Sequence, residues 1–470
     1  MAVEQVTVVD TTVPVVVLTA SPAFLLHGVM GIVRTLGRLD LAVYVVHDDR
    51  WAPPDFSRYL AGKFTSNFDG AAPDGFLEDL LNVGRKIGRR SVLIPVDDVT
   101  ALFVDDHAES LKAWFMFPNQ PAGLARSLSS KQELGLLCQR LGVPTPEMAV
   151  PQSRGDAAAF AEQAQFPVVV KAIDPMLLRQ RVGARSVVIV DSPDALLEAY
   201  ETMKVGGIPN SLLQEYIPGG PESIWMFNGY FDNRSECLFD FTGTKLRQYP
   251  PYTGPACLAV CRRNPPLEQA TKAFLKTIGY RGIVDLGYRY DGREGDYKLL
   301  DVNPRIGATF RLFTAANGMD VARALYLDLT GQPVPRSVAP DGRKWIVEHH
   351  DLLASRQYRR DGQLSLKEWV RSLRGVREAA WFAWDDPAPF AAMCWRSTLI
   401  AIQRARERKA AGAHLKRGRS ATPRQVTSPM PVEQQRLVNT YFEELAPFWR
   451  DVYQDHSVFG AIHRYRQPSP

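Results

Sequence analysis

The sequence predicts an α/β protein with a helical extension at its C-terminal end. Short β-branched runs alternate with helical stretches through the first 125 residues, a pattern typical of a parallel sheet covered by helices. Within residues 282–308, two further β runs flank a glycine-rich turn, which indicates an antiparallel hairpin and an α+β region. From about residue 340 the chain is helical in pattern, rich in aromatic side chains and finally basic.

Length and composition are consistent with several globular domains. The chain has 470 residues, of which 45% are hydrophobic and 23% charged, which is ordinary globular usage. At about 100–200 residues per domain, we expect three domains or two with an appendage. Five cysteines without CxxC pairs predict neither a disulfide framework nor a structural zinc site.

The N-terminal part should be a parallel α/β layer. Strand-like runs lie at 13–20, 41–48 and 91–97, with helical stretches between them. Acidic residues follow the second and third runs, at the strand ends where open sheets bind ligands: Asp48, Asp49, Asp97 and Asp98. No G-x-G-x-x-G follows the first strand, so the dinucleotide fingerprint is absent.

A second part begins after the polar, turn-rich residues 118–130. Ser130 and Glu133 have capping-box spacing, so a helix should begin at Lys131 and run to the turn LGVPTP. The β run FPVVVKA then ends with Lys171, whose neighbours should be buried. A buried lysine either extends its ammonium to solvent or holds an anion, and the residues alone leave both open.

Acidic residues also bracket a Pro-Gly turn in the segment SLLQEYIPGGPES. Glu215 precedes the turn and Glu222 follows it. An ordinary interpretation is a strand end that carries solvated acids.

The strongest chemical pattern is GIVDLGYRYDGREGDYKLLDVNPRIGA, residues 282–308. Asp285 lies on its first β run, and Asp301 and Asn303 lie two residues apart on the second, so the latter two face the same side. Hard oxygen donors on one face suit Mg²⁺, and Arg305 follows at the same parity. The alternative is Asn-Pro turn chemistry in which the aspartate pairs with the arginine.

Taken in order, five of these features resemble the ATP-grasp superfamily. They are Lys131 opening a helix that leads into LGVPTP, Lys171 ending FPVVVK, the hinge QEYI, Glu222, and the terminal LLDVNPR. The likeness covers roughly residues 10–335 and points toward carboxylate–amine ligases, including D-aspartate ligase and carbamoyl-phosphate synthetase. It implies an ATP-grasp fold with an N-terminal domain at 1–125, a small subdomain at 126–212, a large subdomain at 213–335 and an extension at 336–470.

The resemblance also implies a role for each matching residue. Lys131 and Lys171 would contact ATP phosphates, with Lys171 also counted as catalytic. The backbone around Glu215, Tyr216 and Ile217 would bind the adenine edge, and Glu222 the ribose. The remaining residues would hold Mg²⁺ and steady the transferred phosphoryl group: Asp285, Asp301 and Asn303 for the metal, and Arg305 for the phosphoryl group.

The implied activity is ATP- and Mg²⁺-dependent ligation, in which a small, amino-acid-like carboxylate becomes an acyl phosphate and is coupled to an amine. The alternatives are a small-molecule kinase on the same fold, or a nucleotide-binding scaffold that recruits a partner such as a methyltransferase through its tail.

The chain departs from the family pattern at Ser130, where many relatives have Asp, at the loop 179–186 with its single glycine, and at the D-x-N motif in place of E-x-N. Lys245 and Arg247 face either this cleft or solvent.

Charge and hydropathy bear on partners and location. The net charge of +5 arises in residues 401–420, which hold seven basic side chains against one acid, so the rest of the chain sums to −1 and predicts no nucleic-acid surface. With neither a secretory signal nor about 18 uninterrupted apolar residues, we expect a cytoplasmic protein without a transmembrane segment.

Residues 389–420 form an apolar-to-basic stretch that suits a partner helix, a solvated linker or a membrane surface. The resemblance adds a homodimer as a prior, and four tryptophans, at 345, 369, 381 and 384, are expected to pack on the preceding domain.

Overall fold

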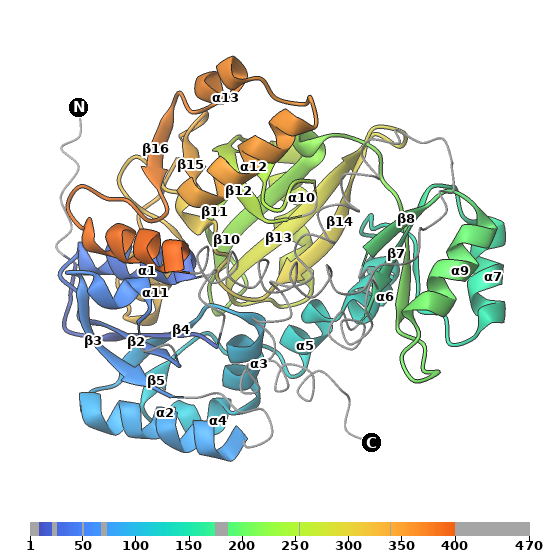
Figure 1. Ribbon diagram of the computed structural model, residues 1–470. Helices are drawn as coiled ribbons and strands as arrows, with labels where there is room; N and C mark the ends of the chain where they lie inside the picture. Colours follow the sequence, from blue (N-terminus) through green and yellow to red (C-terminus); the bar gives the residue numbers. More distant parts are fainter. Residues whose placement is uncertain are drawn as a thin grey trace, which may run out of the picture.

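The computed structural model describes residues 9–20, 26–48, 51–66, 73–173, 187–252, 254–338 and 340–399. Three β-sheets organise these stretches. In Figure 1 the N-terminal sheet lies at the lower left, the largest sheet in the centre and the smallest at the right.

The N-terminal sheet is parallel throughout and has the order β3-β2-β1-β4-β5. Its strands are β1 (Val15–Leu18), β2 (Val43–His47), β3 (Leu60–Thr65), β4 (Ser91–Pro95) and β5 (Phe115–Met116). Its helices are α1 (Leu26–Gly37), α2 (Pro73–Ile87), α3 (Asp98–Asp106) and α4 (Ala108–Leu111), with the short η2 (Pro53–Phe56). The predicted parallel layer is confirmed. Strand β3 was not predicted, because LAGKFT is an edge strand whose side chains alternate between exposed and half-buried.

Both faces of this sheet are covered. Val15 and Val17 pack in the core shared with the large sheet, whereas Val16 and Leu18 pack toward α2 and α3. The N-terminal layer and the large sheet therefore share one continuous hydrophobic core.

The large sheet has seven strands in the order β14-β13-β10-β11-β12-β15-β16. They are β10 (Ile224–Phe231), β11 (Cys237–Gln248), β12 (Ala256–Cys261), β13 (Gly282–Asp291), β14 (Asp296–Asn303), β15 (Lys344–Ile346) and β16 (Val376–Ala379). Its helices are α5 (Leu124–Ser129), α6 (Lys131–Leu141), α10 (Pro265–Thr277) and α11 (Val321–Leu329), with η3 (Pro221–Ser223) and η4 (Phe310–Leu312). The predicted hairpin is confirmed as β13 and β14, which pair antiparallel. Helix α6 begins at Lys131 as predicted, since the Ser130 hydroxyl accepts a hydrogen bond from the Glu133 amide at 3.4 Å.

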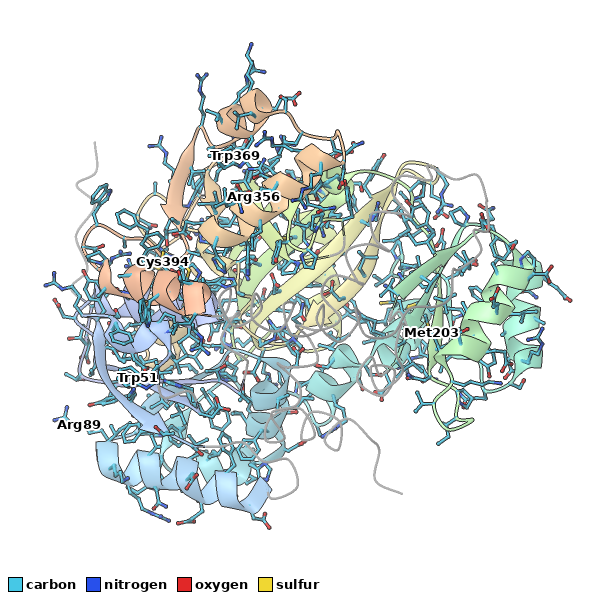
Figure 2. All side chains as sticks on the ribbon, viewed as in Figure 1. Trp51, Arg89, Met203, Arg356, Trp369 and Cys394 are labelled. Carbon is cyan, nitrogen blue, oxygen red and sulfur yellow. The ribbon has the colours of Figure 1, made fainter. Side chains whose placement is uncertain are left out.

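The small sheet has the order β6-β9-β7-β8 and carries two helices on one face. Its elements are β6 (Met148–Ala149), α7 (Arg154–Gln163), β7 (Val168–Ala172), β8 (Val187–Val190), α9 (Pro193–Met203) and β9 (Ser211–Glu215). Val168 and Val170 pack against these helices, and Met203 closes the same core (Figure 2). Because side chains alternate along β7, Val169 and Lys171 point to the opposite face, toward the large sheet.

The C-terminal extension adds structure to the large sheet. Helices α12 (Glu348–Arg360) and α13 (Leu366–Ser372) lie between β15 and β16, and β15 pairs with β12. Of the four tryptophans expected to pack, Trp345 and Trp381 are buried and Trp369 is half-buried, donating to Asp351 at 2.9 Å. The expectation is wrong for Trp384, which lies in a turn before the last described helix and is 90% exposed. No helix among the described stretches has the length and apolar character needed to cross a membrane.

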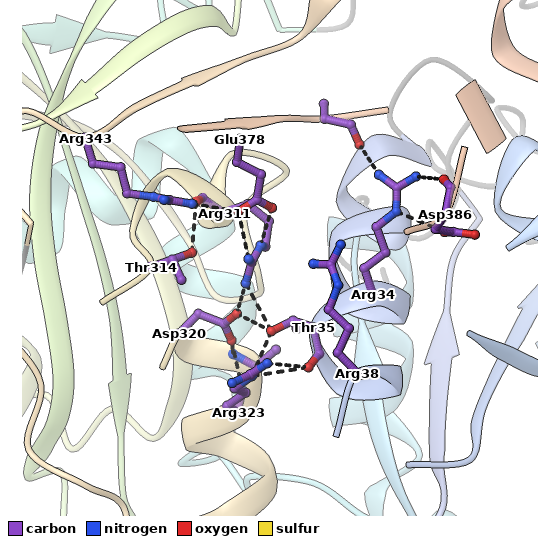
Figure 3. Close-up of polar contacts among 12 residues, drawn as sticks. Arg34, Thr35, Arg38, Arg311, Thr314, Asp320, Arg323, Arg343, Glu378 and Asp386 are labelled. Carbon is purple, nitrogen blue, oxygen red and sulfur yellow. Dashed lines mark hydrogen bonds and ion pairs between the residues drawn. The ribbon is translucent and has the colours of Figure 1, made fainter. Parts of the chain in front are cut away.

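A network of arginines ties the extension to α1 and α11 (Figure 3). Arg34 on α1 bonds to Asp386 at 3.0 Å and to the Trp381 carbonyl at 2.7 Å. Arg311 bonds to Glu378 on β16 at 2.7 Å and to Asp320, the residue that caps α11. These buried pairs hold the N-terminal layer, the large sheet and the extension together.

Candidate active site

A cleft of about 370 Å³ opens between the small sheet and the large sheet. Strands β7, β8 and β9 line one side, strands β11, β13 and β14 line the other, and the turn after β9 closes one end. Of the residues predicted from the sequence, the cleft contains Lys131, Lys171, Glu215, Tyr216, Ile217 and Asp301.

Four cationic side chains reach this cleft without an acidic partner among the described residues. Lys171 donates to the amide oxygen of Gln214 at 2.6 Å, Lys131 to the Leu300 carbonyl at 3.4 Å, and Lys245 to the Gly254 carbonyl at 3.5 Å. The fourth, Arg289, donates to the Gly219 carbonyl, and its Nε is buried with no hydrogen-bond partner there. The hydrogen bonds that these four side chains make within the described residues therefore go to neutral oxygens, although the carboxylate of Asp301 lines the same cleft.

Burial makes three of these charges costly, whereas Lys131 is exposed. Burial lowers the pKa of the Lys171 ammonium to about 8, reinforced by the nearby charge of Lys131. It also lowers the pKa values of Lys245 and Arg289. A desolvated cation without an anion destabilises the free protein, so the arrangement suits an anionic ligand that restores neutrality.

The turn after β9 lines the cleft, and the Glu215 side chain lies in an ion-pair cluster. Its carboxylate contacts Lys298 at 2.9 Å and Arg293 at 2.5 Å. Although Glu215, Asp291 and Glu294 lie close enough to share a metal ion, Lys298 bonds to all three, so we interpret the group as an ion-pair network. Glu222, on η3, is exposed at the edge of the turn, and Gly220 lies directly beside its carboxylate.

The three predicted metal ligands come together on the hairpin. Asp285 and Asn303 are cross-strand partners, and the Asn303 amide donates to the Asp285 carbonyl at 3.1 Å and to the Asp301 carboxylate at 3.4 Å. Burial raises the pKa of the Asp285 carboxyl to about 7, and its Oδ1 is buried without a hydrogen-bond partner among the residues described. Glycines make room for both carboxylates, since a Cβ at Gly307 would lie 2.5 Å from Asp285 and one at Gly287 would lie 2.1 Å from Asp301. An orphaned buried oxygen among hard donors fits a divalent cation.

Arg305 links this cluster to the N-terminal sheet. Its Nε contacts Asp98 at 2.7 Å, and its Nη2 donates to the Asn303 side-chain oxygen at 3.2 Å. The two acidic residues after β4 therefore have different roles. Asp98 reaches the site, whereas Asp97 caps α3 and is engaged by Thr19 at 3.0 Å and by other local donors, so its role is structural.

The structure confirms the cleft for Lys245, whereas both alternatives for Arg247, the cleft and solvent, are wrong because its side chain is buried in an ion pair. Lys245 lines the cleft, whereas Arg247, two residues along β11, pairs with Asp351 of the extension at 2.7 Å. Sequence reasoning missed Arg289, Gln214 and Gln248, all of which line the cleft. The only signal for Arg289 was an arginine inside the β run GIVDLGYRY. Asp49 and the loop 179–186 lie outside the described residues.

Comparison with known proteins finds relatives in sequence and in fold. No protein-family model matches the sequence. D-aspartate ligase from Enterococcus faecium (strain Aus0004) is 24% identical over 287 residues, which cover 58% of this chain and 68% of that protein. Among solved structures, an N5-carboxyaminoimidazole ribonucleotide synthetase in complex with ADP gives a TM-score of 0.55 at 11% identity, covering 75% of this chain and 87% of that one. The chain is therefore similar in sequence to ligases, and it has the ATP-grasp fold of its structural neighbours.

Other matches are to proteins of the same kind. The C-terminal section of the carbamoyl phosphate synthase large chain from Methanopyrus kandleri is 24% identical over 233 residues, which cover 47% of this chain and 42% of that protein, so the match spans less than half of that relative. The L-amino acid ligase from Bacillus licheniformis gives a TM-score of 0.50 at 14% identity, covering 68% of this chain and 75% of that one.

Proposed function

We propose that this ATP-grasp ligase uses ATP and Mg²⁺ to activate a small, amino-acid-like carboxylate as an acyl phosphate, which it then couples to an amine. The observation that carries the proposal is the convergence of four cations without ion-pair partners among the described residues on a cleft that contains Asp301, which Asn303 links to Asp285 outside the cleft lining. A polyphosphate with a divalent cation complements both sets of charges.

The nucleotide would span the cleft from the turn after β9 to the hairpin. Backbone groups at Glu215, Tyr216 and Ile217 would bind the adenine edge, and the exposed carboxylate of Glu222 would bind ribose hydroxyls. Lys131 and Lys171 would contact the phosphates. Lys245 and Arg289 join them as phosphate ligands, since they share the same cleft and lack acidic partners among the described residues.

Asp285, Asp301 and Asn303 would hold the Mg²⁺. When bound, the ion would neutralise charge on the β- and γ-phosphates. In support, one solved structure with this fold, a biotin carboxylase domain dimer from Hydrogenobacter thermophilus, is in complex with MgADP (TM-score 0.50, 16% identity). A homodimer remains a proposal for this chain.

The reaction would proceed in two displacements. A carboxylate oxygen of the first substrate attacks the γ-phosphorus, and ADP leaves. The amine nitrogen then attacks the acyl carbon, the C–O bond to phosphate breaks, and the nitrogen loses a proton. Arg305 would steady the transferred group, and Asp98 would hold its guanidinium in place through the 2.7 Å contact.

One relative is a D-aspartate ligase, and we therefore propose an amino acid as the carboxylate substrate. The test is ADP release from the purified full-length chain against pools of amino acids and small carboxylates, with and without amines. Mass spectrometry of the product should then show a condensed compound together with phosphate. A stable phosphomonoester would instead establish the kinase alternative. ADP release unaffected by every pool would favour the scaffold alternative, in which residues 385–470 recruit a partner.

A further inference from the structure

Five nitrogen-bearing aromatic rings gather where α1 meets the C-terminal extension. They belong to His27 on α1, Trp345 on β15, His349 and His350 on α12, and Trp381 after β16. The centroid of the His27 ring lies 5.8 Å from that of Trp345 and 6.2 Å from that of Trp381. The His350 ring lies 6.4 Å from His27 and 4.0 Å from His349, which is in turn 6.3 Å from Trp381. We call these five residues the imidazole–indole cluster.

Three nitrogens of this cluster are buried without a hydrogen-bond partner among the described residues: Trp345 Nε1, Trp381 Nε1 and His349 Nδ1. Trp345 and Trp381 are each only 1% exposed. Buried polar atoms are nearly always hydrogen-bonded, so three that are not, in rings of one cluster, indicate that a bound molecule supplies the missing bonds. His349 and His350 are half-buried, so the cluster can be reached from outside the protein.

The hydrogen-bonding capacity of the rings indicates the kind of molecule. Burial lowers the pKa of His349 to about 4 and that of His350 well below its usual value, so both rings are neutral at neutral pH. A neutral imidazole accepts a hydrogen bond at one nitrogen and donates at the other, whereas an indole N–H can only donate. A ligand that complements the cluster therefore offers an N–H group to an imidazole and acceptor oxygens to the indoles. An amine that also carries a carboxylate or a hydroxyl group offers both.

Two elements connect the cluster to the candidate active site. On α1, Gly28 directly follows His27, and a Cβ at Gly28 would lie 3.1 Å from the Cα of Ala308, in the segment after the proposed metal ligands. The Tyr249 ring stacks on His350 at 4.7 Å, and Tyr249 directly follows β11, whose last residue lines the cleft. In Figure 1, α1, β15 and α12 lie to the left of the hairpin, whereas the small sheet lies to its right. The cluster therefore adjoins the candidate active site on the side away from the small sheet.

We propose that the imidazole–indole cluster binds the amine substrate and that His349 accepts the proton that this amine loses. The inference rests on the proposed ligase reaction and assigns residues to its second step. The amine nitrogen forms a bond to the acyl carbon, the C–O bond to phosphate breaks, and inorganic phosphate leaves with that electron pair. One N–H proton passes to Nδ1 of His349 and from there to solvent. Trp345 and Trp381 hold the acceptor oxygens of the substrate through their indole N–H groups.

The test compares coupling of the amine with capture of the acyl phosphate by hydroxylamine, which is largely uncharged at neutral pH and attacks acyl phosphates without a protein base. The full-length chain receives ATP, Mg²⁺ and a pool of amino acids and amino alcohols, with or without hydroxylamine, and the products are measured by mass spectrometry. The variant is His349→Phe, which keeps an aromatic ring beside His350 and Trp381 but removes both nitrogens. We expect coupling to fall by about 100-fold or more, with hydroxamate formation unchanged.

The matched control is His107→Phe. His107 is also half-buried, but it lies between α3 and α4 in the N-terminal layer, and its Nδ1 contacts the Phe103 carbonyl at 3.0 Å. This variant should couple the amine as wild type does.

Two further variants test binding separately from proton transfer. Trp345→Phe and Trp381→Phe each keep a buried ring and remove one N–H donor, so each should raise the KM of the amine by about tenfold and leave the KM of ATP unchanged. An equal rise in both KM values would show a structural role instead. These variants also decide the proposal if thermal unfolding shows that His349→Phe does not fold.

The possible failures are distinguishable. No hydroxamate from wild type would overturn the proposed ligase reaction, and this inference with it. Hydroxamate from wild type together with normal coupling by His349→Phe would overturn the inference alone, and the cluster would then hold only water. Hydroxamate formation that falls in His349→Phe as far as coupling does would also overturn it, because His349 would then act before the amine step. Wild type that forms hydroxamates but no condensed product would show that the amine carries no acceptor oxygen.

Discussion

The cleft and the extension interface use buried cations in opposite ways. At the interface, Arg34, Arg311 and Arg343 each contact a carboxylate within 3.0 Å. In the cleft, Lys171 and Lys245 contact only neutral oxygens among the described residues. A buried cation that is paired with a carboxylate fixes two segments relative to each other. A buried cation without such a partner carries a desolvation cost that an anionic ligand would offset. The difference shows that the charges of the extension interface are neutralised within the protein, whereas those of the cleft suit neutralisation by a ligand.

The largest expected effect is on catalysis. Lys171→Ala and Asp301→Ala should each reduce ATP turnover by about 1,000-fold or more, because each removes a group that compensates charge in the transition state. Turnover is measured as substrate-dependent ADP release, with circular dichroism as the folding control. If Asp301→Ala turns over ATP as fast as wild type, the metal assignment is wrong.

The second expected effect is on stability, and its sign should differ between the extension interface and the cleft. Arg311→Met should lower the free energy of unfolding by about 3 kcal/mol, because Asp320 and Glu378 lose their common partner. Lys171→Met should raise the melting temperature of the nucleotide-free protein, since it removes a desolvated charge without an acidic partner. Thermal unfolding without ATP measures both. A loss of stability in Lys171→Met would contradict the proposed difference between the regions.

A third effect concerns the pH dependence of ATP binding. The pKa of Lys171 is lowered to about 8 in the free protein, so the side chain is charged below that pH and neutral above it. Phosphate binding favours the charged form, and ATP affinity should therefore fall by about tenfold between about pH 7 and about pH 9. Calorimetric titration across this range measures the change. Lys171→Arg, whose guanidinium stays charged, should flatten the profile, and an equally steep fall in that variant would assign the titration to another group.

The smallest expected effect lies at the rim of the interface. Arg38 contacts Asp385 at 2.8 Å, but both side chains are partly exposed to solvent. Asp385→Asn should therefore cost less than about 1 kcal/mol of unfolding free energy. Because Arg38 lowers the pKa of Asp385, the contribution is present at neutral pH and is lost in acid. Chemical denaturation at two pH values tests this, and a cost as large as that of Arg311→Met would mean that exposure does not govern these pairs.

Features encoded by neighbouring residues could be predicted from the sequence. The Ser130 cap, the β13–β14 hairpin and the common face of Asp301 and Asn303 follow from capping chemistry and strand periodicity. The exposure of Trp384 was not predicted, because burial of an aromatic ring depends on what packs against it.

The sequence by itself determined the order of the motifs and several of the residues that line the cleft, since local periodicity and spacing carry that information. Only the tertiary structure decided the partners. Asp98 and Arg305 are 207 residues apart, and Arg247 and Asp351 are 104 apart, yet each pair is in contact. It also decided that Lys245 faces the cleft while Arg247, on the same strand, pairs with the extension. Periodicity can predict that a charged side chain leaves a strand on a given face, but whether that side chain meets a carboxylate or lines a cleft depends on long-range packing.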